Sequence, residues 1–441
     1  MKKLFYTVFV TSGLGLFSIV GMAQSATDTL LQNVDLQTVV QYALKNYPLV
    51  QQALLDEKIT DRQIKSRLAD WYPQLNLNGT YQYNFQIPKT YFNNTYVTSG
   101  TSHVSLLGLG ASQTLFNRDV LLASRTAKDV RLQSKEATVS DKIDVAVDVS
   151  KAFYDVILTQ KQIDVLNDDI ERLERSLKDA YNQYRGGLVD KTDYKRATIS
   201  LNNSKAEKKS DEELLKAKYA ILKQEMGYSG TNDITLDYDS AKMEAGIYAD
   251  TLAAVDYNNR IEYQSLMTQK RLQIANLQYN KWSYYPTLSA NGAYNLNYLN
   301  NSFPHLFDQS YPNSYAGLTL SFPIFQGTKR IQNIRIAELQ VQRADLDIVN
   351  IKNAIHSQYA QALATYKGYL NDYFILKENL ELARDVFNTI ELQYRSGIKA
   401  YLDLITAQTD LRTAQTNYSN ALYQVLTSKL DVQKSLGTVQ Y

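Results

Sequence analysis

The sequence predicts a mostly α-helical fold with a membrane β-barrel part, assembled from two tandem copies of one unit. Three observations predict it. The chain of 441 residues repeats its own motifs about 210 residues apart. Apolar residues recur at spacings of three and four along very long stretches without proline. Two segments of alternating polarity contain almost no charged residue.

The duplication is carried by matching motifs in the two halves. The segment 71–75 (WYPQL) recurs at 284–288 (YYPTL), and the segment 184–187 (YRGG) recurs at 394–397 (YRSG). The last glycines of the second pair are 397 − 187 = 210 residues apart, as are Gly227 and Gly437. Chance similarity between coiled coils would not place glycines and helix ends in register. We therefore expect one structural unit repeated twice.

The helices are predicted from the placement of proline, which costs roughly 3 kcal/mol inside a helix. No proline lies between 89 and 285 or after 323. A helix over 118–184 would be roughly 100 Å long, so it must pack along its neighbours rather than around one globular core. The predicted first repeat spans 24–230, with a helix, a strand hairpin at about 74–116, a long helix at about 118–184 and a return helix at about 191–226. A linker over 231–253 leads to the second repeat, 254–441, with a helix at about 254–283, a strand hairpin at about 287–325, a long helix at about 327–394 and a return helix at about 400–436.

The strands are predicted from strict alternation of apolar and polar residues. Between 74 and 87 every second residue is apolar or glycine, and the same pattern covers 287–298. Partner strands are expected at about 103–116 and 314–325. Lys89 is the only Lys, Arg, Asp or Glu in 74–116, and Asp308 is the only one in 287–326, both in predicted outer loops. Because a charge in hydrocarbon costs several kcal/mol, this depletion predicts strands that face lipid.

Aromatic residues gather where the predicted strands begin, as they do at the boundary between lipid and water. They are Trp71, Tyr72, Trp282, Tyr284 and Tyr285. Four strands per chain cannot close a barrel, since about eight is the practical minimum and lipid tolerates no open sheet edge. The barrel is therefore expected to be shared between identical chains.

The N-terminal segment 1–23 is predicted to be a secretory signal. Lys2 and Lys3 precede an apolar run, and the small-residue site at 21–23 (GMA) follows it, so the mature chain would begin near Gln24. A membrane anchor is the alternative, but the apolar run is short and is interrupted by Thr, Ser and Gly. The 47 basic and 45 acidic residues nearly balance, and no basic tract interleaved with aromatics suggests nucleic acid.

No motif for catalysis is present. His103, His305 and His356 belong to different predicted elements, and the chain has no cysteine and no phosphate-binding loop. We expect no enzyme activity, no cofactor and no metal site. The scattered Asp and Glu residues of the helices are expected to lie on solvated faces.

The signal, the strand hairpins between long helices and the tandem duplication together resemble the TolC-like outer-membrane efflux proteins over essentially the whole mature chain. The Tyr-Pro-x-Leu strand entries and the Tyr-Arg-x-Gly turns at 184–187 and 394–397 carry the resemblance. It implies a homotrimer with a twelve-stranded barrel and a periplasmic α-barrel with a gated tip. It also implies docking to a periplasmic adaptor and an inner-membrane pump in efflux or type I secretion. A non-conducting structural or adhesive spacer of the envelope is the alternative function.

The resemblance also implies site residues at the helix tips. Tyr394, Lys399 and Asp403 match the family's constriction, and Asp193 matches the acidic partner of the basic residue, whereas Thr406 stands where a second acid is expected. Lys399 replaces an Arg, so a bidentate clamp on a carboxylate is not available. The alternative for Asp193 and Lys399 is a solvated ion pair worth ~0–1 kcal/mol. The residues implied to meet the adaptor are Arg185, Gly187, Leu188, Arg395, Gly397 and Ile398.

Overall fold

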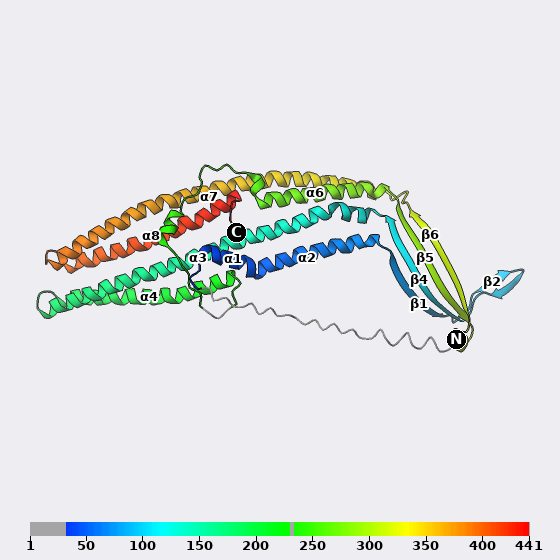
Figure 1. Cartoon of the computed structure of the whole chain (residues 1–441), viewed down its shortest axis with the longest axis horizontal. Helices are drawn as coiled ribbons and strands as arrows, with labels where there is room; N and C mark the ends of the chain where they lie inside the picture. The colour runs from blue at the N-terminus through cyan, green and yellow to red at the C-terminus, as the bar shows by residue number, and fades with distance from the viewer. Residues whose placement is uncertain (1–31, 230–232, 441) are drawn as a thin grey trace.

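The computed structural model describes residues 32–229 and 233–440, so the predicted signal segment lies outside the described residues. Figure 1 shows an elongated molecule whose helices run lengthwise from a sheet at one end to helix tips at the other. The first half contains α1 (Leu36–Asn46), α2 (Pro48–Leu68), β1 (Gln74–Tyr83), β2 (Lys89–Phe92), β3 (Thr95–Thr98), β4 (His103–Phe116), α3 (Arg118–Arg185) and α4 (Lys191–Glu225). After α5 (Ser240–Ala245), the second half contains α6 (Ile261–Lys281), β5 (Thr287–Asn300), β6 (Ser310–Ser321), α7 (Lys329–Arg395) and α8 (Tyr401–Leu436).

The two halves have the same order of long elements, and their bounds differ from the expected ones at three places. The helix expected from 254 begins at Ile261, because Asp256 caps a short 3₁₀ turn over Tyr257–Asn259 first. The alternation read as far as 87 ends as a strand at Tyr83, and the strand expected at 314–325 runs over Ser310–Ser321. The small hairpin β2–β3 was not predicted as strands.

The long helices owe their bounds to local capping. The Asn117 side chain accepts a hydrogen bond of 2.8 Å from the Asp119 N–H at the start of α3. At the start of α4 the Asp190 side chain accepts from the Thr192 N–H at 3.2 Å. None of the helices in the described part of the chain is both long and apolar enough to cross a membrane.

The four long strands form one antiparallel sheet in the order β1-β4-β5-β6, so β1 and β6 are its two edges. Directly paired residues share a face of the sheet. The register pairs Leu77 with Leu109 and Leu109 with Tyr294, which places the predicted apolar positions of three strands on one face. Leu288 pairs with Leu320 of β6 on the same face.

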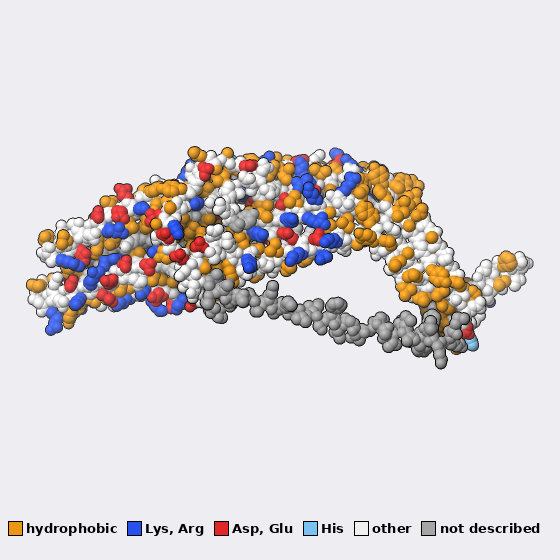
Figure 2. Space-filling view, viewed as in Figure 1, with side chains coloured by type: hydrophobic (Ala, Val, Ile, Leu, Met, Phe, Trp, Pro, Cys, Tyr) orange, Lys and Arg blue, Asp and Glu red, His pale blue; other side chains and the backbone are white. Residues whose placement is uncertain are grey.

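No described residue of the chain covers that apolar face. The side chains of Leu75 and Leu318 are each 70% exposed. Figure 2 shows the apolar colour gathered over the sheet, whereas acidic and basic side chains are spread over the helices. The opposite face is polar, and there the Asn295 amide donates to Asn313 at 2.9 Å and Thr319 donates to Asn291 at 3.1 Å. The sheet thus separates an apolar side from a hydrogen-bonding side.

The helices meet along a seven-residue repeat, as coiled coils do. In α7 the buried positions Tyr366, Tyr373, Leu380, Phe387 and Tyr394 follow one another every seventh residue. The repeat of α8 faces them with Leu404 and Leu411. Each helix pair is therefore a long antiparallel hairpin, α3 with α4 and α7 with α8, and both hairpins point away from the sheet (Figure 1).

Candidate functional site

The two helix-to-helix turns at the tips are built alike. The Gly187 N–H donates to the Tyr184 carbonyl at 3.0 Å, and the Leu188 N–H donates to the Gln183 carbonyl at 2.9 Å. In the second turn the Gly397 N–H donates to the Tyr394 carbonyl at 3.0 Å, and the Ile398 N–H donates to the Gln393 carbonyl at 2.8 Å. This is the glycine-ended helix cap in which a left-handed residue satisfies the last carbonyls.

Each turn presents one apolar side chain to the outside. Leu188 is 79% exposed and Ile398 is 73% exposed, although the backbone of both turns is hydrogen-bonded. Arg185 precedes Leu188 by three residues. In the second turn, the Arg395 guanidinium lies 2.8 Å from the Glu391 carboxylate. The six residues expected to meet an adaptor thus lie at two equivalent tips, each with one apolar and one basic side chain.

The α7–α8 helix hairpin packs two tyrosines against the α3–α4 helix hairpin. Tyr394 and Tyr401 contact each other edge to face, with ring centroids 6.0 Å apart. Both are buried in one cluster with Ala180 of α3 and Ala197 of α4, which are fully buried. The small alanines allow the large rings to approach closely. Tyr401 was missed by the sequence reasoning, because its position in the first half, 191, holds a Lys.

Burial raises the pKa of the Tyr394 hydroxyl, and the charges of Asp179 and Asp193 add to the rise. Burial likewise raises the pKa of Tyr401, with smaller additions from Tyr394 and Asp193. Asp193, on α4, is therefore electrostatically close to both rings. The Tyr401 hydroxyl is buried without a hydrogen-bond partner.

The charged residues of the predicted constriction are only partly brought together. Lys399 lies 4.0 Å from Asp403, one helical turn away, and both side chains are nearly half exposed. The Asp403 carboxylate also accepts from the Ala400 N–H at 3.3 Å, as a helix N-cap contact. Within the part of the chain that the structure describes, no ion pair joins Asp193 to Lys399.

A buried polar network, missed from the sequence, joins the two hairpins above the tip. Asp169 of α3, which is 3% exposed, accepts from the Ser204 hydroxyl of α4 at 2.8 Å and from the Gln408 amide of α8 at 3.1 Å. Arg172 lies 3.9 Å from the same carboxylate and over the Phe387 ring of α7. The expectation that helix acids are solvated is wrong at Asp169, which three helices share.

The linker between the two halves is held to the second hairpin by tyrosines of the α7 repeat. The Tyr359 hydroxyl donates to the Ala253 carbonyl at 3.0 Å, and the Tyr366 hydroxyl donates to the Ile247 carbonyl at 2.9 Å. Tyr366 also accepts from the Ala249 N–H at 2.9 Å. A sequence signal existed, since Tyr359, Tyr366 and Tyr373 are seven residues apart.

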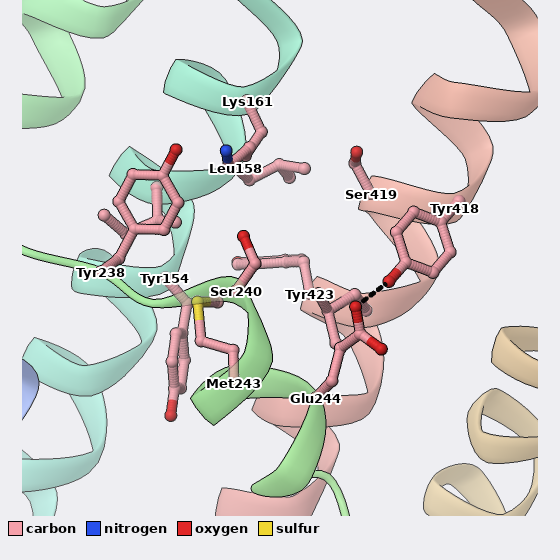
Figure 3. A pocket seen from close by; sticks show the side chains of 12 residues that line it. Tyr154, Leu158, Lys161, Tyr238, Ser240, Met243, Glu244, Tyr418, Ser419 and Tyr423 are labelled. Atoms are coloured by element: carbon pink, nitrogen blue, oxygen red, sulfur yellow. Dashed lines mark hydrogen bonds between the residues drawn. The ribbon is translucent and has the colours of Figure 1, made fainter. Parts of the chain in front are cut away.

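Glu244 of α5 is the charged anchor of this linker. Its carboxylate accepts from Tyr418 at 2.6 Å, from Tyr373 at 3.1 Å and from the Lys377 ammonium at 2.5 Å. Figure 3 shows Glu244 reaching Tyr418 at one side of a small, partly open pocket of about 90 Å³ between α3, α5 and α8. Tyr154, Tyr238 and Tyr423 also line that pocket, together with apolar side chains and the polar Lys161.

We expect Glu244→Gln to lower the free energy of unfolding by about 1–3 kcal/mol, because hydrogen bonds to a charged group are lost. Burial raises the pKa of Glu244, but the donors Lys377, Tyr418 and Tyr373 outweigh it and hold that pKa below the ordinary 4.5. A lowered pKa stabilises the fold above the unfolded value and loses that effect as the pH falls through the folded pKa.

The measurement is thermal unfolding of both proteins at neutral pH and at successively lower pH values below 4.5. The difference in Tm between the native chain and Glu244→Gln should shrink as the pH falls. A difference that stays constant down to the acid limit would show that the Glu244 charge contributes nothing.

The aromatic residues at the strand entrances do not all behave alike. Tyr72, Tyr284 and Tyr285 are about half exposed or more, and Trp71 is 38% exposed. Trp282 is the exception, because it is buried and the Arg125 guanidinium lies 4.8 Å from its ring centre. The Trp282 ring packs against α3, and the placement of these five aromatic residues at a boundary between lipid and water stays a prediction.

No group of three or more His, Asp or Glu side chains that could hold a metal ion occurs among residues 32–229 and 233–440. The arrangement instead consists of long surfaces: an apolar sheet face and two turns at the far end.

Comparison with known proteins identifies the family. Residues 39–227 and 267–438 match the family described as outer membrane efflux protein. The outer membrane protein TolC of Vibrio cholerae serotype O1 is 21% identical over 100% of this chain and 96% of its own length. The outer membrane protein OprJ of Pseudomonas aeruginosa is 22% identical over 94% of this chain and 87% of its own.

A solved structure has the same fold. The outer membrane protein VceC of Vibrio cholerae superposes with a TM-score of 0.72 at 14% identity, covering 91% of this chain and 96% of that one. The family match covers well over half of the chain, in both halves of the duplication. The chain therefore belongs to the outer membrane efflux protein family and is a protein of the outer membrane.

Proposed function

We propose that three copies of this chain form a channel-tunnel that conducts substrates out of the cell. Each copy contributes the sheet β1-β4-β5-β6 to a shared barrel of twelve strands in the outer membrane. The helices continue the barrel as a tunnel into the periplasm. A periplasmic adaptor meets the tips at 185–188 and 395–398, and an inner-membrane pump supplies the energy, in a tripartite efflux or type I secretion system.

The observation that carries the proposal is the sheet with two free edges and one apolar face. A sheet in lipid must have every backbone N–H and C=O group paired, so β1 and β6 need strands of other copies. The polar face, with its asparagine side chains, then lines a water-filled interior. The number of three copies is inferred from the family. The need for more than one copy is inferred from the unpaired edge strands β1 and β6.

The experiment is reconstitution of the purified protein. Native mass measurement in detergent should give three copies, and planar-bilayer recording should give discrete single-channel currents. A water-soluble monomer that needs no detergent would exclude a lipid-facing sheet. A membrane-bound trimer without discrete current would favour the spacer function instead.

At the tip we propose that Tyr394, Lys399, Asp403 and Asp193 form the constriction. Within one chain Lys399 is near Asp403, so we assign the contact of Lys399 with Asp193 to neighbouring copies. Three copies of Asp403 around a narrow mouth would make an acidic ring that favours cations. Leu188, Gly187, Arg185, Arg395, Gly397 and Ile398 form the surface that meets the adaptor.

For this constriction we expect Lys399→Ala to raise the closed-state current of channels in planar bilayers. Removing the ammonium breaks the attraction between copies and leaves the Asp403 ring uncompensated. Lys205→Ala is the control, because its partner Glu174 lies 2.7 Å away within the same hairpin. An unchanged closed-state current in Lys399→Ala would exclude a closing role for this residue.

A further inference from the structure

The small hairpin β2–β3 is a separate two-stranded sheet beyond the end of the long strands that lies away from the helices, and none of the described residues covers it. Figure 1 shows it standing clear of the four long strands. Every residue of both strands is exposed, including Tyr91, Phe92, Tyr96 and Val97. A two-stranded hairpin alone is at best marginally stable in water. This hairpin, residues 89–98, is called the outer hairpin below.

The outer hairpin has a well-defined turn and register. Asn93 and Asn94 both have positive φ, 47° and 60°, which suits the two-residue turn that matches strand twist. The Tyr91 hydroxyl donates to the Asn94 side chain at 2.7 Å. Tyr91 pairs with Tyr96, and Phe92 pairs with Thr95. The turn and the strand register of the outer hairpin are therefore defined, although all of its strand residues are exposed.

Each face of the outer hairpin carries two large apolar or aromatic side chains, beside Lys89 and Thr98 on one face and Thr90 and Thr95 on the other. Paired residues share a face and successive residues alternate, so Tyr91 and Tyr96 lie on one face and Phe92 and Val97 lie on the other. The Tyr91 and Tyr96 rings contact each other with centroids 5.1 Å apart. A hairpin that rested on a single surface would need only one apolar face. Two apolar faces indicate a neighbour on each side.

We propose that the outer hairpins of neighbouring copies pack in a ring, the Tyr91–Tyr96 face of one against the Phe92–Val97 face of the next. This inference rests on the proposed trimer. A ring of identical subunits joins two different faces of each copy, and such contacts close under rotation. Each hairpin then has the two neighbours that its two faces require.

The exposed area favours a second copy over a foreign partner. Burying these three aromatic rings and one valine removes roughly 500 Å² from water, since an aromatic side chain buries 150–250 Å². An independent complex needs about 800 Å² per partner. Copies that are already joined through the edges of their sheets need no larger contact area than this. A soluble partner that contacted only the hairpin would bind weakly.

Position and reach agree with this contact. The outer hairpin directly follows β1, which is an edge strand and so belongs to the proposed boundary between copies. From Tyr83 to the Asn93–Asn94 turn the chain can extend about 30 Å, at ~3.3 Å per residue. A barrel of twelve tilted strands has a radius of roughly 12 Å, from ~4.8 Å between strands and a tilt near 40°. Hairpins of adjacent copies can therefore meet.

Cysteine cross-linking tests the contact, and the chain has no cysteine of its own. Thr98 lies on the tyrosine face and Thr95 on the phenylalanine face. Differently tagged Thr95→Cys and Thr98→Cys chains are co-expressed and treated with a short bismaleimide. We expect cross-linked dimers that carry both tags. Preparations of either variant alone should lose this product, because like faces do not meet.

Native mass in detergent is measured on the same samples, so that the two failures can be told apart. Intact trimers without the mixed product, or with equal linking in the single-variant controls, would overturn the ring of hairpins and leave the channel untouched. A particle that is not trimeric would overturn the proposed function and the ring with it. Cross-linking to a cysteine of another protein in place of the mixed product also refutes the inference.

Discussion

Replacing Asp169 by alanine is expected to lower the free energy of unfolding by about 3–5 kcal/mol, because it breaks a buried charged network from one side. Ser204, which is 3% exposed, would keep a buried donor without its acceptor, and the buried Gln408 amide would keep only its 3.4 Å bond to the backbone carbonyl of residue 169. Arg172 would lose the carboxylate that lies 3.9 Å from its Nη2 atom. Among the described residues, its Nε and Nη2 atoms have no hydrogen-bond partner that could replace this attraction.

The consequence for function is a looser joint between the two hairpins. Asp169 connects α3 and α4 with α8, and a few turns further toward the tips Tyr394 packs against Ala180. If the network holds the hairpins together, Asp169→Ala should raise the closed-state current as well as lower the Tm. A lowered Tm with an unchanged current would mean that the network serves stability alone.

Two variants calibrate this prediction. Asp168→Ala removes the neighbouring carboxylate, which is exposed, and should change the free energy of unfolding by less than ~0.5 kcal/mol. Asp169→Asn should be milder than Asp169→Ala. The Gln408 Oε1 has no partner, so the amide can turn over and accept from the new Asn while Ser204 still donates to the Asn oxygen. Equal losses in Asn and Ala would assign the whole effect to the charge.

Much of the fold could be predicted from the sequence because its signals are local and long. The helix expected at 118–184 is found at Arg118–Arg185, since a capping Asn117 and the glycines at 186–187 mark its ends. The apolar face of the sheet was predicted from alternation, and the strand register confirms it. Membership of the efflux family, recognised on the turn and strand motifs, is confirmed.

What could not be predicted depends on contacts between distant segments. Asp169 resembles any other helix acid until Ser204 and Gln408 are brought to it from 35 and 239 residues away. Glu244 lies in a short helix without an apolar repeat, and its donors come from α7 and α8. The contact of Asp193 with Lys399 is proposed to join neighbouring copies, so it stays a prediction.

The second large effect is expected from Gly437→Ala, which should lower the free energy of unfolding by about 2–5 kcal/mol through backbone strain and overpacking together. Gly437 ends α8 with φ of 71°. A Cβ there would lie 2.7 Å from the carbonyl carbon of Asn259 and still nearer to its oxygen. Asn259 precedes α6, so the end of one long helix rests directly on the start of another.

Gly227, the equivalent residue of the first repeat, makes a similar close contact, so the two repeats can be compared within one protein. Gly227 has φ of 65°, and a Cβ there would lie 2.7 Å from the Tyr47 Cα, between α1 and α2. Gly227→Ala should therefore be about as damaging as Gly437→Ala. Gly397→Ala is the matched control, since Gly397 has φ of 74° but no atom within 4 Å of its Cβ position, so only the strain of about 1–2 kcal/mol applies.

Thermal unfolding of the three variants separates the two contributions. If close packing of the return helices against the starts of α2 and α6 stabilises each repeat, Gly227→Ala and Gly437→Ala should both melt well below Gly397→Ala. Equal losses of Tm in all three would mean that the left-handed backbone alone matters at these glycines. In that case the approach of the helix ends would tolerate an added methyl group, and the junction in each repeat would be looser than its short distances imply.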